Sequence, residues 1–380
     1  MADGLAPSKM RQLYITVALP ALTYTSDIWY TPPFRTAYTQ KLYSSVKVTK
    51  LLRMIQGMAT RYITGGIKGI AYDMLEIHAY VPPVDLLFHK AQFRAASRIC
   101  TLPPDHPLRP LACRTAADFV KSHWSPLHYL FFTTSIKPKQ TKTISPVHHN
   151  PTYHTTMKTV ISKDKETAYH AAMIAHNMAH YKVYCDGLGY KNRVGTAAVL
   201  YKGNRVVKSL LLHVGPTTEH TVYETKLIGI LLALHLLTLL SCQLMSLTVI
   251  IGLDNQAAIK SLNNQNVKPA HYLLDQIHNA AKHLQSKQDH IVCKADFQQA
   301  KFNNLHLKTK TRDVCDLHIN WVSGHSNFEP NEKADEANKR AALGESSLPK
   351  DLPSFHRKPI VLNIATLHQE FNARIQRIWA

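Results

Sequence analysis

The stretch Val183-Tyr184-Cys185-Asp186-Gly187-Leu188-Gly189 decides which fold the sequence predicts. Three apolar or aromatic residues lead directly into an acid, and two glycines follow. This pattern is typical of a buried strand that presents a carboxylate where the strand ends. A buried carboxylate without a partner costs free energy, so we expect further polar groups to meet Asp186 there.

Three more acids follow downstream, on elements of alternating type. Glu224 lies near the start of a long apolar helix predicted over 219–240, on a stripe that we expect to pack on the sheet. Asp254 follows a predicted strand over 247–253, and Asp335 belongs to a short Ala-rich helix. Taken alone, each acid also has a structural explanation. Glu224 suits the helix dipole, Asp254 suits a helix N-cap, and Asp335 suits a solvated helix face.

Taken together, the four acids favour a metal site. Four carboxylates at one end of a sheet would repel each other, and they would protonate or disorder unless a cation held them. Hard oxygen ligands suit Mg²⁺ or Mn²⁺ rather than zinc. Two such ions can clamp a phosphodiester between an attacking water and the leaving oxygen.

The composition limits the class of protein. The 380 residues carry 45 basic against 25 acidic side chains, a net charge of +20, which favours a polyanionic partner such as nucleic acid. Six scattered cysteines without a CxxC pair indicate a reducing compartment. The longest apolar run, Leu227–Leu240, is interrupted by His235 and is too short to cross a bilayer. We therefore expect a soluble, intracellular protein of the nucleus or cytoplasm, with no membrane contact.

The pattern along the chain predicts four parts. Residues 1–134 read as mainly helical, 135–180 as a basic linker with a short helix, and 346–380 as a tail with a helix. Between them, 181–345 predicts three antiparallel strands, then helix, strand, helices, strand and helix. This is an α/β unit with a mixed five-stranded sheet flanked by helices. A helix is predicted over 270–284, and the polar stretch 285–313 that follows it carries no clear pattern.

Residues 182–345 resemble a type 1 ribonuclease H domain, of the kind that ends fungal non-LTR retrotransposon polyproteins. The matching pieces are YCDG at 184–187, HTVYETKLIGILLALHLL at 220–237, LDNQAAIKSL at 253–262 and WVSGHSNFEPNEKADEANK at 321–339. The N-terminal region resembles the segment between reverse transcriptase and ribonuclease H in these elements, through LLRMIQGMATRYITG at 51–65. No Asp-Asp pair of a polymerase palm occurs, so we expect a fragment of such an element.

The resemblance implies a ribonuclease H-like sheet and a metal-dependent endonuclease that hydrolyses the RNA strand of RNA–DNA hybrids. It implies two Mg²⁺ ions, for which Mn²⁺ would substitute, held by four acids: Asp186, Glu224, Asp254 and Asp335. His325 would assist proton transfer or product departure. Three further residues would contact nucleic acid: Gly187, Asn255 and Gln256. No obligate protein partner is evident.

Two departures and two alternative functions accompany this resemblance. Leu188 stands where the family commonly has a small hydroxyl residue, and Pro330 replaces the usual glycine, which stiffens the loop that carries His325. One alternative is a catalytically silent, hybrid-binding remnant of a retroelement. The other is a transposase or integrase nuclease, which typically uses three acids ending in a glutamate, so four acids with Gly324-His325 argue against it.

Overall fold

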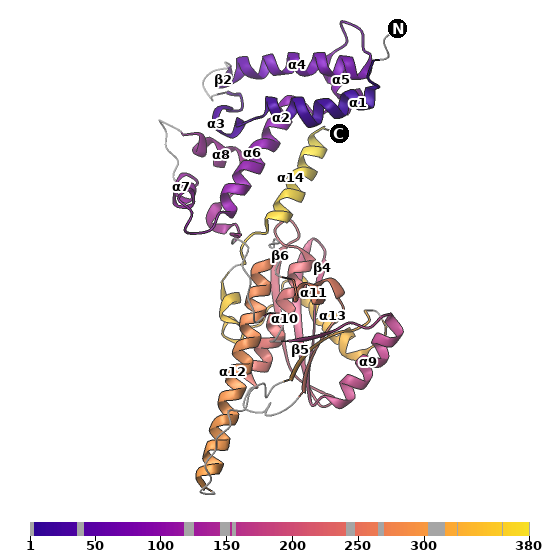
Figure 1. Ribbon diagram of the computed structural model, residues 1–380, viewed down its shortest axis with the longest axis vertical. Helices are drawn as coiled ribbons and strands as arrows, with labels where there is room; N and C mark the ends of the chain where they lie inside the picture. Colours follow the sequence, from indigo (N-terminus) through magenta and orange to yellow (C-terminus); the bar gives the residue numbers. More distant parts are fainter. Residues whose placement is uncertain are drawn as a thin grey trace. The chain divides into compact units, whose positions relative to one another are not determined.

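The structure, a computed structural model, divides the chain into two compact units (Figure 1). Unit 1 comprises residues 1–143 together with 368–380, and unit 2 comprises 144–367. The predicted tail 346–380 is thereby shared between the two units. The structure describes residues 4–35, 42–117, 125–144, 153, 157–240, 248–264, 270–302, 316–324, 326–358 and 360–379.

Unit 1 is mainly helical, as the sequence predicts. Its helices are α1 Pro7–Leu13, a π-helical turn Tyr14–Ala18, α2 Leu19–Leu22, α3 Ser26–Trp29, α4 Val46–Thr64, α5 Tyr72–Ala79, α6 Val84–Thr101, α7 Leu108–Thr115, α8 Pro126–Thr134 and part of α14 Ile364–Trp379. A short ribbon pairs β1 Phe34–Arg35 with β2 Leu42–Tyr43. The longest of these helices, α4, ends at Gly65, whose left-handed backbone (φ 70°) glycine adopts at little cost.

Stacked aromatic rings and one buried polar network hold unit 1 together. The ring centroids of Phe93 on α6 and Phe371 on α14 lie 3.9 Å apart. The buried carboxylate of Glu76 accepts a hydrogen bond of 2.6 Å from the amide of Gln56, and the Tyr14 hydroxyl donates to the same amide at 3.0 Å. Burial raises the pKa of Glu76, and the hydrogen bond from Gln56 opposes this effect.

Unit 2 is built on a six-stranded mixed sheet. Its strands are β3 Lys158–Val160, β4 Tyr181–Tyr190, β5 Arg193–Lys202, β6 Arg205–Pro216, β7 Thr248–Leu253 and β8 Asp316–Trp321. They lie in the order β3-β8-β7-β4-β5-β6, with β4, β5 and β6 antiparallel and the rest parallel.

The predicted mixed sheet flanked by helices is confirmed, but it has one strand more than the predicted five. The extra strand, β3, falls inside the predicted linker 135–180. It pairs in parallel with β8 and covers backbone groups that an exposed edge would leave unpaired. This pairing links residues more than 150 positions apart, which local sequence patterns do not indicate.

Helices cover both faces of the sheet (Figure 1). The helices of unit 2 are α9 Lys165–Met178, α10 Val222–Leu239, α11 Gln256–Ser261, α12 His271–Phe302 and α13 Glu329–Ala342. On one face, α10, α11 and α12 share a core with Val183 and Ile251. On the other face, α9 and α13 pack around Tyr184 and Phe328.

The lengths of α12 and α10 differ from expectation. Helix α12, predicted over 270–284, runs on to Phe302 through part of the unassigned polar stretch, because no glycine or proline interrupts it. Among the described helices, α10 is the one that is long and apolar enough to cross a membrane. However, 67% of it is buried inside the protein, as in a core helix.

Candidate functional site

Two of the predicted acids stand at equivalent positions of neighbouring parallel strands. The pairing of β4 with β7 ends at Tyr184 and Gly252. Asp186 and Asp254 each follow two residues later, so both carboxylates reach the same end of the sheet just where the two strands stop pairing. The expectation drawn from the sequence concerned four acids, of which these are two.

Between these two carboxylates lies an ammonium group that the sequence analysis did not consider. The Nζ atom of Lys226 is 2.7 Å from Oδ1 of Asp186 and 2.6 Å from Oδ1 of Asp254. The side chains of Lys226, Asp186 and Asp254 are 12%, 4% and 21% exposed. Charge pairs shielded from water to this degree interact more strongly than surface pairs.

Close contact between α10 and β4 directs Lys226 to this place. A Cβ atom added to Gly187 would lie 2.3 Å from the hydroxyl of Thr225 and 2.6 Å from the backbone nitrogen of Lys226. A Cβ on Gly229 would lie 3.2 Å from the carbonyl oxygen of Asp186. The two glycines therefore let helix and strand touch, and the helix face that meets Asp186 is the one that carries Lys226.

Glu224 occupies a different face of α10, about 200° from Lys226 around the helix. Its Oε2 atom accepts from the backbone nitrogen of Thr221 at 3.1 Å, while its own backbone nitrogen donates to the Thr221 hydroxyl at 3.2 Å. This reciprocal pair is a capping box. Nδ1 of His220 lies 3.9 Å from the same carboxylate, and the Glu224 charge adds to the effect of burial in raising the pKa of Tyr272.

Two predicted site residues remain, Asp335 and His325. Asp335 lies on α13 and is partly exposed. His325 falls outside the described residues. Gly324, directly before it, passes close to Asp254, because an added Cβ would lie 3.2 Å from the Oδ2 atom of that aspartate.

The predicted nucleic-acid contacts have structural tasks of their own. Asn255, rather than Asp254, caps α11, and its Oδ1 atom accepts from the backbone nitrogen of Ala258 at 2.8 Å. Gln256 is the first residue of that helix and is partly exposed. Gly187 is buried against α10, as its missing Cβ requires.

The arrangement of these side chains does not fit the two implied Mg²⁺ ions. Within the described ranges, no three His, Cys, Asp or Glu side chains gather so as to hold a metal ion. The two aspartates that do converge have an ammonium between them. An ammonium donates hydrogen bonds and offers no lone pair to a metal.

The charges at this centre are strongly coupled. Burial and, to a smaller extent, the charge of Asp254 raise the pKa of Asp186 to about 8, although Lys226 opposes this rise. Burial alone would lower the pKa of Lys226, but the two carboxylates outweigh burial, and that pKa is raised. Lys226 therefore stays protonated at neutral pH and serves as the counter-ion of the pair.

A signal for Lys226 was present in the sequence. Glu224 and Lys226 are the only acidic or basic residues of α10 apart from His235. A lysine in an otherwise apolar core helix needs carboxylate partners, because an isolated buried charge is very costly. Lys226 also precedes Gly229 by three residues, which places both on one helix face.

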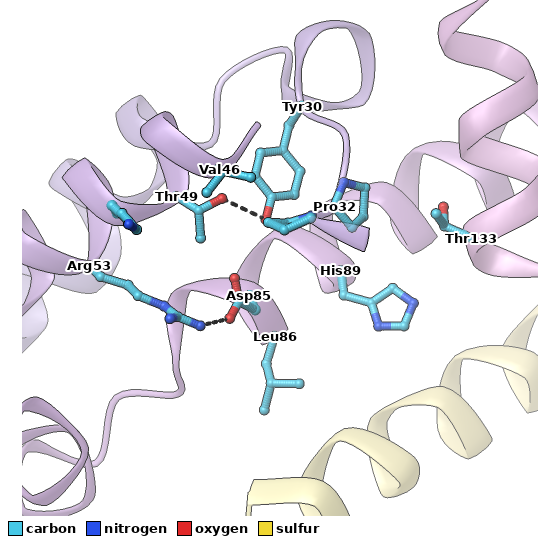
Figure 2. A pocket seen from close by; sticks show the side chains of 11 residues that line it. Tyr30, Pro32, Val46, Thr49, Arg53, Asp85, Leu86, His89 and Thr133 are labelled. Atoms are coloured by element: carbon cyan, nitrogen blue, oxygen red, sulfur yellow. Dashed lines mark hydrogen bonds and ion pairs between the residues drawn. The ribbon is translucent and has the colours of Figure 1, made fainter. Parts of the chain in front are cut away.

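A separate cavity lies in unit 1, with a volume of about 540 Å³ (Figure 2). Arg53 and Asp85 form an ion pair at its wall. The hydroxyl of Thr49 donates to the Tyr30 hydroxyl at 3.3 Å. The rest of the wall combines apolar side chains with Lys50, His89 and Thr133, and it contains none of the site residues predicted from the sequence.

Comparisons with known proteins found similarity among solved structures. No protein-family model and no curated protein matches the chain. Among solved structures, it is similar to RNase H1 of Halobacterium salinarum, with 17% identity and a TM-score of 0.28 over 43% of this chain and 98% of that one.

Two further solved structures give similar values. LC11-RNase H1 in complex with an RNA/DNA hybrid has 14% identity and a TM-score of 0.30, over 43% of this chain and 96% of that one. The protease–reverse transcriptase of prototype foamy virus has 13% identity and a TM-score of 0.29, over 45% of this chain and 22% of that one. At these identities the likeness concerns the fold alone and assigns no activity to this chain.

Proposed function

We propose that unit 2 is a nucleic-acid-binding domain that holds RNA–DNA hybrids without hydrolysing them. The observation that carries this proposal is the Lys226 ammonium between Asp186 and Asp254. Hydrolysis of the kind that the motif resemblance implies needs oxygen ligands around divalent ions, and Lys226 takes the central position among the acids that converge.

Charge and motif resemblance support nucleic acid as the partner. The net charge of +20 attracts a polyanion and predicts binding that weakens with salt. A ribonuclease H-like domain would recognise a hybrid through its RNA 2′-hydroxyls and groove shape, without reading bases. Gly187, Asn255 and Gln256 are the candidate contacts, although the first two also have structural tasks.

The second candidate function is metal-dependent cleavage of the RNA strand. The shared end of the sheet for Asp186 and Asp254 favours it. It would require Lys226 to leave the pair and two Mg²⁺ or Mn²⁺ ions to bind, with help from Glu224, Asp335 and His325. Glu224 would also have to leave its capping box, so we rank this function second.

We further propose that the chain derives from a fungal non-LTR retrotransposon polyprotein. The support for this origin is the order of the four motif blocks between 184 and 339 together with the N-terminal block at 51–65. Such an origin would explain how a domain of this fold keeps its nucleic-acid partner after its chemistry has been altered.

A binding and cleavage assay on the full chain tests the proposed function. A hybrid with a fluorescent RNA strand is titrated in EDTA and in Mg²⁺, and anisotropy and gel mobility are read from the same samples. We expect salt-sensitive binding in both buffers and an intact RNA strand, with double-stranded DNA bound more weakly. A known ribonuclease H serves as the positive control for cleavage.

One result would overturn the proposal in favour of the second candidate. This is cleavage in Mg²⁺ that EDTA stops and that Asp186→Asn abolishes. Absence of hybrid binding at low salt would contradict both functions. Cleavage of duplex DNA in preference to the hybrid would point to the transposase or integrase alternative.

A further inference from the structure

We infer that Lys226 is a built-in counter-ion that takes the place of a divalent cation between Asp186 and Asp254, and that replacing it with an acid opens a cation site there. The inference deepens the proposed function, because it names what controls the same centre. The inference and the proposed function share one premise, the position of Lys226 between Asp186 and Asp254. Metal binding is measured without nucleic acid, so that either idea can fail alone.

The geometry leaves no room for a metal ion while Lys226 is in place. Its Nζ atom lies within hydrogen-bonding distance of one oxygen from each aspartate, at 2.7 Å and 2.6 Å. A Mg²⁺ ion must touch its oxygen ligands at about 2.0–2.1 Å. The position that a bridging ion would need is therefore held by a group that cannot act as a ligand.

The balance of charges also disfavours a divalent ion beside Lys226. Two aspartates supply at most two negative charges, and Lys226 neutralises one of them. A divalent ion that entered beside Lys226 would place three positive charges against two negative ones. At this low exposure to water, repulsion between the ion and the ammonium is only weakly screened. The ion and Lys226 thus compete for the same carboxylates.

Lys226 has the advantage in that competition because it is attached. The contacts at Gly187 and Gly229 hold its helix against β4, so the ammonium starts next to its partners. A tethered group acts at an effective concentration of about 1 mM or more, without the entropy cost of binding from solution. Free Mg²⁺ must also give up tightly held water to enter.

Surface ion pairs of the same domain provide a contrast. Lys158 pairs with Asp316 at 2.8 Å, with side chains 68% and 42% exposed. Lys208 pairs with Asp351 at 3.4 Å, with side chains 42% and 35% exposed. Water screens such pairs, whereas Lys226 bridges two acids and is largely shielded. Lys208 therefore offers a matched position for a control with the same charge change.

The test measures Mn²⁺ binding to the full chain by the electron paramagnetic resonance signal of free Mn²⁺, without nucleic acid. We expect the unaltered chain to bind no Mn²⁺ at this centre at about 1 mM, because the tethered ammonium competes at that level. The Lys226→Glu chain should gain one Mn²⁺ site, because a third carboxylate replaces a cation. Its Kd should lie at least about a hundredfold below that 1 mM level. Adding Asp186→Asn to that variant should remove the site.

The control is Lys208→Glu, which makes the same charge change away from the centre and should gain no such site. Two results would overturn the inference. One is Mn²⁺ binding by the unaltered chain that Asp186→Asn alone abolishes. The other is a folded Lys226→Glu chain that binds Mn²⁺ no better than the Lys208→Glu control.

A second variant covers the case in which Lys226→Glu does not fold. Lys226→Gln removes the charge and keeps a side chain that donates hydrogen bonds. We expect Mn²⁺ to raise the thermal transition of Lys226→Gln but not that of the unaltered chain. If Mn²⁺ stabilises neither variant, the inference is wrong, whereas Lys226→Glu that folds only with Mn²⁺ supports it.

Discussion

Glu76 of unit 1 and Asp186 of unit 2 both carry buried carboxylates, but the partners of these carboxylates differ in charge. Glu76 accepts a hydrogen bond from the neutral amide of Gln56. Asp186 faces the ammonium of Lys226, which it shares with Asp254. Burial raises the pKa of both acids, and in each case the partner opposes that rise.

This difference decides whether a cation from solution can compete for the buried acid. A neutral network satisfies hydrogen bonds at fixed positions, and no ion from solution can replace an amide. A counter-ion is different, because any cation that reaches the pair competes for the same carboxylates. The neutral network around Glu76 is therefore closed to exchange with solution, whereas the ammonium between Asp186 and Asp254 occupies a position for which another cation can compete.

The largest expected effect is on unit 2 when the counter-ion is removed. Lys226→Met leaves two carboxylates buried without a partner charge, and we expect it to lower the free energy of unfolding of unit 2 by about 3–5 kcal/mol. Native-state hydrogen exchange of β4 amides measures this, with unit 1 amides as the internal reference. Lys208→Met, at a half-exposed pair, should cost about 0–1 kcal/mol. Equal effects of the two variants would remove the distinction between the centre and a surface pair.

The second prediction concerns a buried ionisable group that lacks a polar partner. His356 is 4% exposed, neither ring nitrogen has a hydrogen-bond partner among the described residues, and burial lowers its pKa to about 4. Because the unfolded chain takes up the proton first, this contribution to stability is complete above pH 6.5. It is lost as the pH falls from about 6.5 to 4, and amounts to about 3 kcal/mol.

Urea unfolding of unit 2 across this pH range measures the effect. His356→Leu should reduce the slope of stability against pH in that window without abolishing it, because His176 and His220, whose pKa values burial also lowers to about 4, remain. An unchanged slope in the variant would show that His356 is already charged or solvated in the folded protein.

The third prediction sharpens the comparison from the side of unit 1. Gln56→Leu removes the amide that both Glu76 and Tyr14 use, and it should destabilise unit 1 by about 1–3 kcal/mol. Metal ions should not restore this loss, in contrast to the variants of Lys226. Thermal unfolding with and without Mn²⁺ tests both statements. Restoration of the Gln56→Leu protein by Mn²⁺ would mean that the two buried acids do not differ in kind.

The smallest expected effect tests the structural role of Glu224. Thr221→Ala removes the hydroxyl of the capping box and should cost about 1 kcal/mol, whereas Thr221→Ser should restore most of it. Hydrogen exchange at the start of α10 is the measurement. If Thr221→Ala instead changed Mn²⁺ binding to Lys226→Glu as strongly as Asp186→Asn does, Glu224 would belong to the centre rather than to the cap.

The sequence predicted the sheet better than it predicted the centre. Strand β4 and the convergence of Asp186 with Asp254 follow from local apolar runs that end in an acid. The direction of α10 does not follow, because this helix is buried around most of its circumference. Apolar periodicity then no longer indicates which face of the helix meets the sheet. The expectation placed Glu224 on that face, whereas in the structure Lys226 contacts Asp186 and Asp254.

The other differences have a similar cause. Strand β3 exists only through its pairing with β8, which lies far away in the sequence. The end of α12 was placed too early because apolar spacing fades while helix propensity continues. Non-local pairing and a change of polarity along one helix are both invisible to a search for apolar periodicity.

The absence of side chains at Gly187 and Gly229 fixes how close α10 lies to Asp186, and with it the length of side chain that position 226 requires. Because the two backbones touch there, the four-carbon stem of Lys226 brings its compact ammonium within reach of both aspartates. Arginine carries the same charge on a longer, planar head, so Lys226→Arg would change the geometry of the bridge between the two aspartates while keeping its charge.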